Sequence, residues 1–278
     1  MIQNYNLHTH SVYSDGKSLL KEHVEEAIRQ GLTAIGFSEH GPLPFANTFS
    51  VTNMSGYLAD IENLKEEFGD RIRIYCALEA DYIPGVSEQF SITKERYHLD
   101  YLIGGVHLVG HSANPEELWF IDGPKWEVYD AGFEKLYGGD VRRAVRSFFD
   151  QSNKMIEEEE FDIIAHFDKI KMHNRDRYFH EDEVWYRQLA METLDLIREK
   201  NLMIEVNTRG IYKKRYNGYY PSPWLLSEAH KMGVPAIISS DAHQTNELTL
   251  EFEGAAQALL QAGYHQDGIL WGDLKCWI

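Results

Sequence analysis

The chain has 278 residues, of which 43% are hydrophobic, and this is enough for one large α/β domain or two ordinary domains. The formal net charge of −17 disfavours binding to nucleic acid or to an anionic membrane, because phosphate groups are bound by clustered Lys and Arg. The two cysteines, Cys76 and Cys276, are too few and too far apart for a disulfide framework.

Short apolar runs, typical of buried parallel strands, alternate along the chain with helical patterns and predict a single α/β domain. We expect seven strands, at Gln3–Leu7, Ala34–Phe37, Arg73–Leu78, Tyr101–Val106, Asp162–Ala165, Met203–Val206 and Ala236–Ser239. We expect helices at Leu19–Gln30, Met54–Phe68, Asp140–Glu158, Glu181–Lys200, Pro223–Met232 and Glu247–Ala262. The stretch Leu108–Gly139 is predicted to be irregular, either as a lid over the site or as a plug on the barrel. The tail Trp271–Ile278 is expected to close the barrel bottom or to pack against a partner.

Residues that can bind a metal follow nearly every predicted strand. They are the H-x-H pair His8 and His10, the strand-end residues His40, Glu79, His107 and His166, and the D-x-H pair Asp241 and His243. A single histidine at a strand end is more often an ordinary structural residue. The joint pattern decides in favour of a metal site, because parallel strands of a barrel bring their C-terminal ends to one mouth.

Imidazole and carboxylate ligands without a thiolate suit Zn, Mn or Fe. With Asp15 there are nine candidates, and one tetrahedral ion needs only about four, so we expect two to three divalent ions. Such a cluster generates hydroxide near neutral pH, and hydrolysis is the predicted chemistry. Asp15 by itself also fits a simple turn, since it lies in a Ser-Asp-Gly sequence. Five of the seven remaining histidines are predicted to lie at the surface, namely His23, His173, His180, His230 and His265.

Five segments resemble the polymerase and histidinol phosphatase (PHP) superfamily and, within it, the stand-alone histidinol-phosphatase branch. They are His8–Gly16 (HTHSVYSDG), Gly36–His40 (GFSEH), Leu78–Gly85 (LEADYIPG), Tyr101–His107 and Ser240–His243 (SDAH). The resemblance covers nearly the whole chain. It implies a distorted TIM-like (β/α)7 barrel, with residues 1–278 forming one metallophosphoesterase domain around a trinuclear metal centre.

The resemblance also implies a division of the ligands. One ion is expected at His8, His10, Glu79 and Asp241. A second ion would share Glu79 and bind His107 and His166, and a third would bind Asp15, His40 and His243.

The implied activity is phosphomonoester hydrolysis, with L-histidinol phosphate as the leading substrate, in histidine biosynthesis. A metal-bridging hydroxide would attack phosphorus, and Asp241 or His243 would assist proton transfer to the leaving alkoxide. The expected partner is a small phosphomonoester rather than nucleic acid or membrane. We expect a cytoplasmic location, since no apolar run approaches the ~20 residues of a membrane span and the first residues do not resemble a signal peptide.

The sequence departs from the family where phosphate-binding arginines are expected. After His166 the chain carries Lys169 and Lys171, and the second expected arginine is replaced by Tyr212. Lysine offers a point charge in place of the bidentate fork of arginine. The candidates for substrate binding are therefore Lys171, Arg209, Lys213 and Arg215.

Three alternatives remain open. Another PHP phosphoesterase would act on a nucleotide, a sugar phosphate or phosphotyrosine. An amidohydrolase also uses H-x-H on a barrel, but here Glu79 supplies the bridging ligand and the late Asp241 is followed by His243. A degenerate, non-enzymatic PHP module would be expected to lose ligands, and this chain retains all nine.

Overall fold

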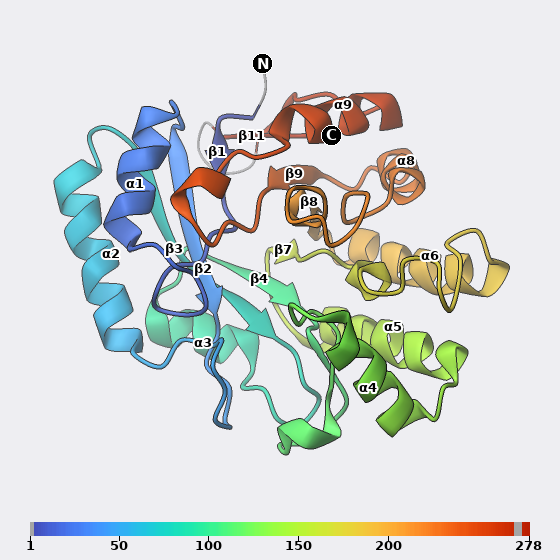
Figure 1. The fold of residues 1–278 in the computed structure, drawn as a ribbon. Helices are drawn as coiled ribbons and strands as arrows, with labels where there is room; N and C mark the ends of the chain where they lie inside the picture. The colour runs from blue at the N-terminus through green and yellow to red at the C-terminus, as the bar shows by residue number, and fades with distance from the viewer. Residues whose placement is uncertain (1–2, 270–273) are drawn as a thin grey trace.

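The computed structural model describes residues 3–269 and 274–278. Seven parallel strands form one sheet in the order β1-β2-β3-β4-β7-β8-β9, and helices surround it (Figure 1). The strands are β1 (Tyr5–Asn6), β2 (Ala34–His40), β3 (Arg73–Asp81), β4 (Tyr101–Gly105), β7 (Ile163–Ile164), β8 (Met203–Asn207) and β9 (Ala236–Ser239). All seven coincide with predicted strands, and the expected single α/β barrel is confirmed.

The N-terminal segment nearly closes the barrel between β9 and β1. The carboxamide of Gln3 donates to the carbonyl of Ile238 at 2.6 Å and accepts from its N–H at 2.9 Å. Further toward the mouth, the N–H of His10 donates to the carbonyl of Ala242, and the N–H of Ala242 donates to the carbonyl of His8. The Gln3 side chain thus makes the hydrogen bonds that the backbone of a longer β1 strand would make. The backbone bonds nearer the mouth place the segments His8–His10 and Asp241–His243 side by side.

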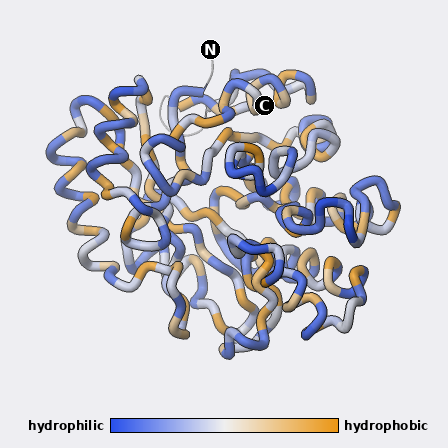
Figure 2. Tube along the Cα trace, in the orientation of Figure 1, coloured by the Kyte–Doolittle hydropathy of each residue, from blue (hydrophilic) through white to orange (hydrophobic). Residues whose placement is uncertain are grey.

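In residues 3–269 and 274–278, seven of the eight helices that are at least eight residues long pack around the strands. They are α1 (Leu20–Arg29), α2 (Met54–Phe68), α3 (Phe90–Tyr97), α5 (Val141–Glu158), α6 (Val184–Glu199), α8 (Pro223–Lys231) and α9 (Phe252–Ala262). Each buries one apolar side, and hydrophobic and hydrophilic residues alternate along the helices in Figure 2. In α5 this side includes Ala144, Phe148 and Met155.

A small inner core fills the barrel below the mouth. Leu7, Ala77, Tyr101 and Ile103 belong to it. The Tyr101 hydroxyl crosses the barrel and donates to the carbonyl of Leu7 at 2.5 Å. A Cβ atom at Gly36 would lie 1.9 Å from that hydroxyl, so this position requires glycine.

The stretch Leu108–Gly139 is more regular than predicted. It contains an antiparallel pair, β5 (Leu108–Val109) and β6 (Trp119–Phe120), followed by the helix α4 (Trp126–Tyr137). Trp119 is buried, and its indole N–H donates to the carbonyl of Tyr129 at 2.8 Å. The stretch packs on the barrel and Phe120 and Asp122 of it line the cavity at the mouth, and its strands and helix correct the prediction of an irregular segment.

Two further predictions are corrected. The helix α3 was not predicted from the sequence. The last helix begins at Phe252 rather than at Glu247, because Thr245–Glu247 forms a short 3₁₀ turn. In that turn the carboxylate of Glu247 accepts from the backbone N–H of His243 at 2.9 Å, and this bond holds the D-x-H segment.

The C-terminal tail closes the bottom of the barrel, although Trp271 lies outside the described residues. Trp277 is buried and pairs with the backbone of Ala236, at the start of β9. Cys276 packs in the inner core as part of the short pair β10 (Gly268–Ile269) and β11 (Lys275–Cys276). Across residues 3–269 and 274–278, none of the helices has the length and apolar character that a membrane span requires.

Candidate metal centre

The nine predicted ligands meet at one mouth of the barrel, around the carboxylate of Glu79. Strand register accounts for part of this, because His40 of β2 lies beside Glu79 of β3. Glu79 is 1% exposed, and its Oε2 lies 3.3 Å from His8 Nε2 and 3.5 Å from His10 Nε2. Its other oxygen, Oε1, lies 3.1 Å from His166 Nε2. Two sides of one carboxylate thus face histidines from different strands.

Three groups of side chains place their ligand atoms within 4.8 Å of one another. They are His8, His10 and Glu79; His40, Glu79 and His107; and His10, Asp15, His40 and His243. His10, Glu79 and His40 each belong to two groups, so the grouping differs in detail from the division that the family resemblance implies.

The donor set fits divalent cations. Nε2 of His8 lies 3.1 Å from Nε2 of His10, and Nε2 of His107 lies 3.2 Å from Nε2 of His166. In each pair one ring, His8 or His107, contacts a carboxylate through Nδ1. A carboxylate only accepts hydrogen bonds, so Nδ1 of that ring carries the proton. In the neutral form of the ring, Nε2 therefore turns a lone pair toward the other histidine. Two lone pairs at this distance need a proton or a metal cation between them. In addition, Nδ1 of His10 and Nδ1 of His40 are buried without a hydrogen bond.

The electrostatics favour cation binding as well. Burial alone would lower the pKa of His8, but the carboxylates of Glu205, Glu79 and Asp241 outweigh burial and raise the pKa well above its ordinary value. The same negative field attracts a metal ion, which takes the place of the proton on the ring. Burial alone would raise the pKa of Glu79, yet His8, His107 and His40 hold it well below its ordinary range. The carboxylate is therefore ionised and ready to bind a metal.

Two acids that orient the histidines were missed in the sequence. Glu205 Oε2 contacts His8 Nδ1 at 2.8 Å, and its Oε1 accepts from the backbone N–H of His166 at 2.9 Å. Asp81 Oδ1 contacts His107 Nδ1 at 3.0 Å and accepts from its backbone N–H at 2.9 Å. Carboxylates in this position fix the tautomer and the direction of a metal-binding ring. An acid inside a buried apolar strand was the signal that could have revealed Glu205.

The loop that carries Asp15 is held by a buried acid, Glu39. Its carboxylate accepts from the backbone N–H and the hydroxyl of Ser11 and from the hydroxyl of Ser14. A Cβ atom at Gly16 would lie 2.4 Å from the carbonyl of His10, so the tight turn requires glycine here. Asp15 Oδ1 consequently reaches His243 Nε2 at 3.0 Å.

Two of the predicted ligands have left-handed backbone conformations. φ is +22° at His166 and +52° at Asp241, and such conformations in residues other than glycine cost on the order of 1–3 kcal/mol. Burial would raise the pKa of Asp241, but Arg209, His8 and Lys169 hold it well below its ordinary range. The fold thus maintains a strained and ionised Asp241 at the mouth.

A cavity of about 390 Å³ with a cationic rim is lined by six of the nine predicted ligands, namely Asp15, His40, Glu79, His107, Asp241 and His243. Lys17, Arg209, Lys213 and Arg215 all line it, as do Phe49, Phe120 and Asp122. Three of the four predicted substrate-binding residues are therefore at the site. Arg209 is fixed there, because its NH1 donates to the carbonyl of Asp241 at 2.5 Å and contacts His243 Nδ1 at 2.6 Å.

Lys171, the fourth predicted substrate-binding residue, lies outside this cavity. It is 1% exposed, and its Nζ contacts Asp168 at 2.6 Å and Glu181 at 3.5 Å. The cation beside the ligands is instead Lys169, whose Nζ lies 2.6 Å from Asp122 and 3.8 Å from Asp241. Burial would lower the pKa of Lys169, but these two acids and Glu79 raise it, so the ammonium keeps its charge.

Two of the histidines expected at the surface are buried. His23 of α1 is 0% exposed, and His173 is 3% exposed. The ring of His23 packs against Phe37, and the Nε2 of His173 contacts the carbonyl of Gly123 at 2.7 Å. Both are structural, and both were misassigned because the sequence does not reveal which face of a helix or loop is covered.

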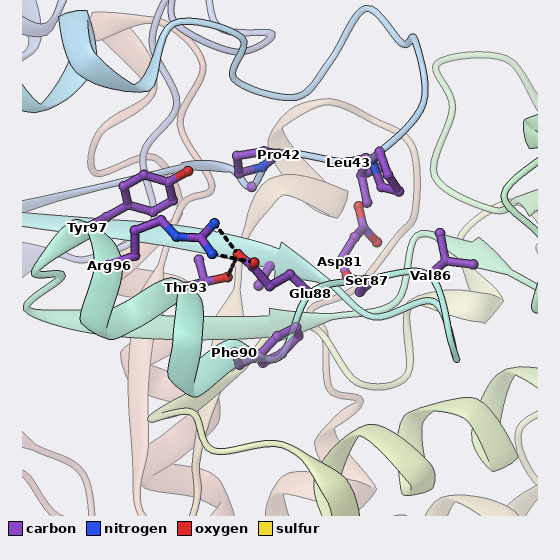
Figure 3. Close-up of a pocket in the computed structure, with 13 residues that line it drawn as sticks. Pro42, Leu43, Asp81, Val86, Ser87, Glu88, Phe90, Thr93, Arg96 and Tyr97 are labelled. Carbon is purple, nitrogen blue, oxygen red and sulfur yellow. Dashed lines mark hydrogen bonds and ion pairs between the residues drawn. The ribbon is translucent and has the colours of Figure 1, made fainter.

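A separate cavity of about 380 Å³ lies between the segment after β2 and the helix α3 (Figure 3). Its lining is mixed, with Pro42, Phe90 and the bidentate ion pair between Arg96 and Glu88. Only Asp81 connects it with the centre, and none of the nine predicted ligands lines it. The chemistry therefore belongs to the cavity at the barrel mouth.

Residues 6–209 match the family described as the PHP domain. The chain belongs to the PHP domain family. A probable histidinol-phosphatase of Deinococcus radiodurans is 28% identical over 252 residues, covering 87% of each chain. The histidinol-phosphatase of Bacillus subtilis is 24% identical over 269 residues, covering 89% of this chain and 96% of the relative.

Two solved structures share the fold. The putative histidinol phosphatase of Listeria monocytogenes superimposes with a TM-score of 0.77 at 18% identity, over 90% of this chain and 99% of that one. The histidinol phosphate phosphatase of Lactococcus lactis, in complex with zinc, L-histidinol and phosphate, gives a TM-score of 0.69 at 22% identity, over 95% of each chain. The fold expected from the sequence is thus confirmed at the level of the PHP barrel.

Proposed function

We propose that this chain is a metal-dependent phosphomonoesterase that hydrolyses L-histidinol phosphate to L-histidinol and phosphate, as a step of histidine biosynthesis. The observation that carries the proposal is the cluster of nine ligand-type side chains around Glu79, six of which line a cavity with a cationic rim. Its relatives in the PHP family include named histidinol-phosphatases that match along most of their length, which supports this substrate.

In this proposal two to three ions of Zn, Mn or Fe are held by His8, His10, Asp15, His40, Glu79, His107, His166, Asp241 and His243. When bound, the ions supply Lewis acidity toward the phosphate and a water nucleophile that is active near neutral pH. Glu79 would help to hold more than one ion, because its two oxygens face different histidines.

The cations of the rim bind the phosphate oxygens. Arg209 and Arg215 offer planar donors, and Lys169 adds a buried point charge beside Asp241. Lys213 contributes less, since its Nζ is already paired with Glu247. Tyr212, which replaces a family arginine, donates its hydroxyl to the backbone carbonyl of Ser240 at 2.8 Å and does not add a charge.

Proton transfer to the leaving alkoxide is assigned to Asp241 or His243. Asp241 Oδ1 lies 3.4 Å from His243 Nδ1, and both residues line the cavity. The D-x-H segment is held in place by Arg209 and Glu247, so neither side chain has to reorganise during the reaction.

The rest of the cavity suits a small ester with a ring. Its volume of about 390 Å³ lies in the range usual for small-molecule sites. Phe49 and Phe120 line it and stack on each other, with ring centroids 5.7 Å apart. An imidazole ring can pack against this aromatic wall while the phosphate lies at the metal centre.

The test is phosphate release by protein reconstituted with Zn or Mn. L-histidinol phosphate is compared with a nucleotide, a sugar phosphate and phosphotyrosine. A kcat/KM for histidinol phosphate far above the others supports the proposal. A higher value for another ester would retain the PHP phosphoesterase chemistry and reject the substrate, and absence of phosphate release in every case would reject both.

A further inference from the structure

Asp122 is an acid of the metal-site cavity that none of the proposed ligand or phosphate roles uses. It lies between β6 and α4, on a backbone held at both sides. The N–H of Ile121 donates to the carbonyl of His107 at 3.0 Å, and the carbonyl of Gly123 contacts His173 Nε2 at 2.7 Å. The Asp122 carboxylate is therefore fixed at the cavity wall, with Oδ2 3.6 Å from His107 Nε2.

The two oxygens of Asp122 have different surroundings. Oδ2 is held by the buried ammonium of Lys169 at 2.6 Å. Oδ1 is buried and has no hydrogen bond within the described part of the chain. Arg215 NH1 is 3.8 Å from Oδ1, too far for a hydrogen bond.

An unsatisfied carboxylate oxygen at a substrate cavity is costly unless a ligand satisfies it. Lys169 is 2% exposed and tightly bound to Asp122, so it is not free to leave. Arg215 has 22% side-chain exposure and only the long contact, so it can turn toward a phosphate at low cost. A second cation, supplied by the substrate, can then take its place at Oδ1.

We infer that Asp122 is a specificity-determining residue, whose Oδ1 accepts a hydrogen bond from the ammonium group of a zwitterionic phosphomonoester. The Arg215 guanidinium then turns from Asp122 toward the phosphate group. The inference deepens the proposed function and rests on it. In an amino-alcohol phosphate of this kind the ammonium-bearing carbon is next to the ester CH₂, so both charges lie close together. Asp122 is close to the metal centre, because the same Lys169 ammonium lies 2.6 Å from Asp122 and 3.8 Å from Asp241.

The consequence is discrimination against esters without an amine. Such an ester leaves Oδ1 either unsatisfied or still covered by Arg215, in which case Arg215 is withheld from the phosphate. A site built around a buried polar group rejects ligands that fail to satisfy it more strongly than an apolar site rejects a missing methylene.

The test compares two esters that differ only in the amine, L-histidinol phosphate and 3-(imidazol-4-yl)propyl phosphate. In wild-type enzyme loaded with metal, kcat/KM is expected to favour the amine-bearing ester. In Asp122→Asn this ratio is expected to fall by about 10-fold or more, chiefly through loss on the amine-bearing ester. The matched control is Asp130→Asn in α4, whose carboxylate pairs with Arg177 outside the cavity and should leave the ratio unchanged.

Equal losses on both esters in Asp122→Asn would overturn the inference, because Asp122 would then act only through Lys169. Loss of bound metal in that variant, measured by elemental analysis, would also overturn it and make Asp122 a ligand. If Asp122→Asn does not fold, Arg215→Ala serves instead. This variant should hydrolyse both esters more slowly and keep or increase the preference for the amine-bearing ester. Loss of that preference would contradict the replacement of Arg215 by the substrate ammonium at Oδ1.

A second substrate pair separates this inference from the proposed function. Ethanolamine phosphate and ethyl phosphate differ in an amine at the same distance from the phosphate. If histidinol phosphate proves a poor substrate but ethanolamine phosphate is strongly preferred over ethyl phosphate, the proposed substrate fails and the ammonium site stands. If histidinol phosphate is hydrolysed well and neither pair is discriminated, the ammonium site fails and the proposed function stands.

Discussion

Glu205 Oε2 lies 2.8 Å from His8 Nδ1, and the other oxygen of the same carboxylate accepts from the backbone N–H of His166 at 2.9 Å. One side chain of β8 thus orients predicted ligands that come from the first and the fifth strand of the sheet. The Ser239 hydroxyl and the Asn207 amide also donate to it, so every contact of this carboxylate is as an acceptor. Glu205 therefore holds the proton on His8 Nδ1 and leaves Nε2 free for a metal.

Glu205→Gln should weaken metal binding while the barrel remains folded. The amide group turns an N–H₂ toward one of the donors, so the His8 ring loses its fixed direction. Loss of a partner that orients a ligand typically costs 10–100-fold in metal affinity, and we expect a loss of about that size. Competition with a metal-binding dye measures it, with the exposed Glu192→Gln of α6 as control. An unchanged affinity would show that His8 does not depend on Glu205.

The ligands could be predicted from the sequence because their placement depends only on the backbone. Parallel strands with a period of two bring Glu79 and the strand-end histidines to one mouth, whatever the details of side-chain packing. Glu205 was missed because the apolar run Met203–Val206 was read only as a buried strand. The inner face of β8 becomes visible only when the neighbouring strands are in place.

The cations could not be assigned from the sequence for a related reason. Lys169 and Lys171 are two residues apart, and their roles depend on partners remote in the chain. Asp122 holds Lys169 at the site, while Glu181 and Ser222 draw Lys171 away from it. Lysine side chains are long and flexible, so only the tertiary structure determines which acid each one reaches.

Replacement of the two lysines should show which of them contributes to substrate binding. Lys171→Met leaves Asp168 as a buried charge without its partner, which typically costs 3–5 kcal/mol, so we expect a loss of unfolding free energy of about that size with KM unchanged. Lys169→Met should raise KM or lower kcat/KM for the phosphomonoester, and it should also lower the unfolding free energy, because Asp122 loses its partner. Urea unfolding and steady-state kinetics test both variants, with the exposed Lys154→Met as control. A raised KM in folded Lys171→Met would return this residue to the phosphate site.

Asp241→Asn should abolish phosphatase activity with little change in the fold. Its Oδ1 faces His10 Nε2 at 3.5 Å, and the amide would replace an ionised ligand in the cluster. We expect activity to fall on the order of 10³-fold or more, because both metal binding and proton transfer are affected. Circular dichroism checks the fold, and the exposed Asp195→Asn of α6 is the matched control. Turnover at the wild-type rate would refute the assignment of Asp241, and His10→Ala tests the neighbouring ligand in the same way.

His23 should make the stability of the protein depend on pH. It is fully buried in α1, and burial lowers its pKa to about 4 from an ordinary value of 6.5. Between these values the unfolded chain binds a proton that the folded chain does not. Unfolding free energy is therefore lost as the pH falls from about 6.5 to about 4, by roughly 3 kcal/mol over the whole interval.

The measurement compares wild type with His23→Leu, both free of metal, by urea unfolding between pH 7 and pH 4.5. Leucine fills the same apolar space and does not titrate, so its curve should decline less steeply, and any packing difference should shift the curve by a constant amount. The exposed His265→Asn is the control and should follow wild type. Parallel curves for wild type and His23→Leu would mean that His23 takes up its proton in the folded chain as readily as in the unfolded one, and that its burial is not maintained in solution.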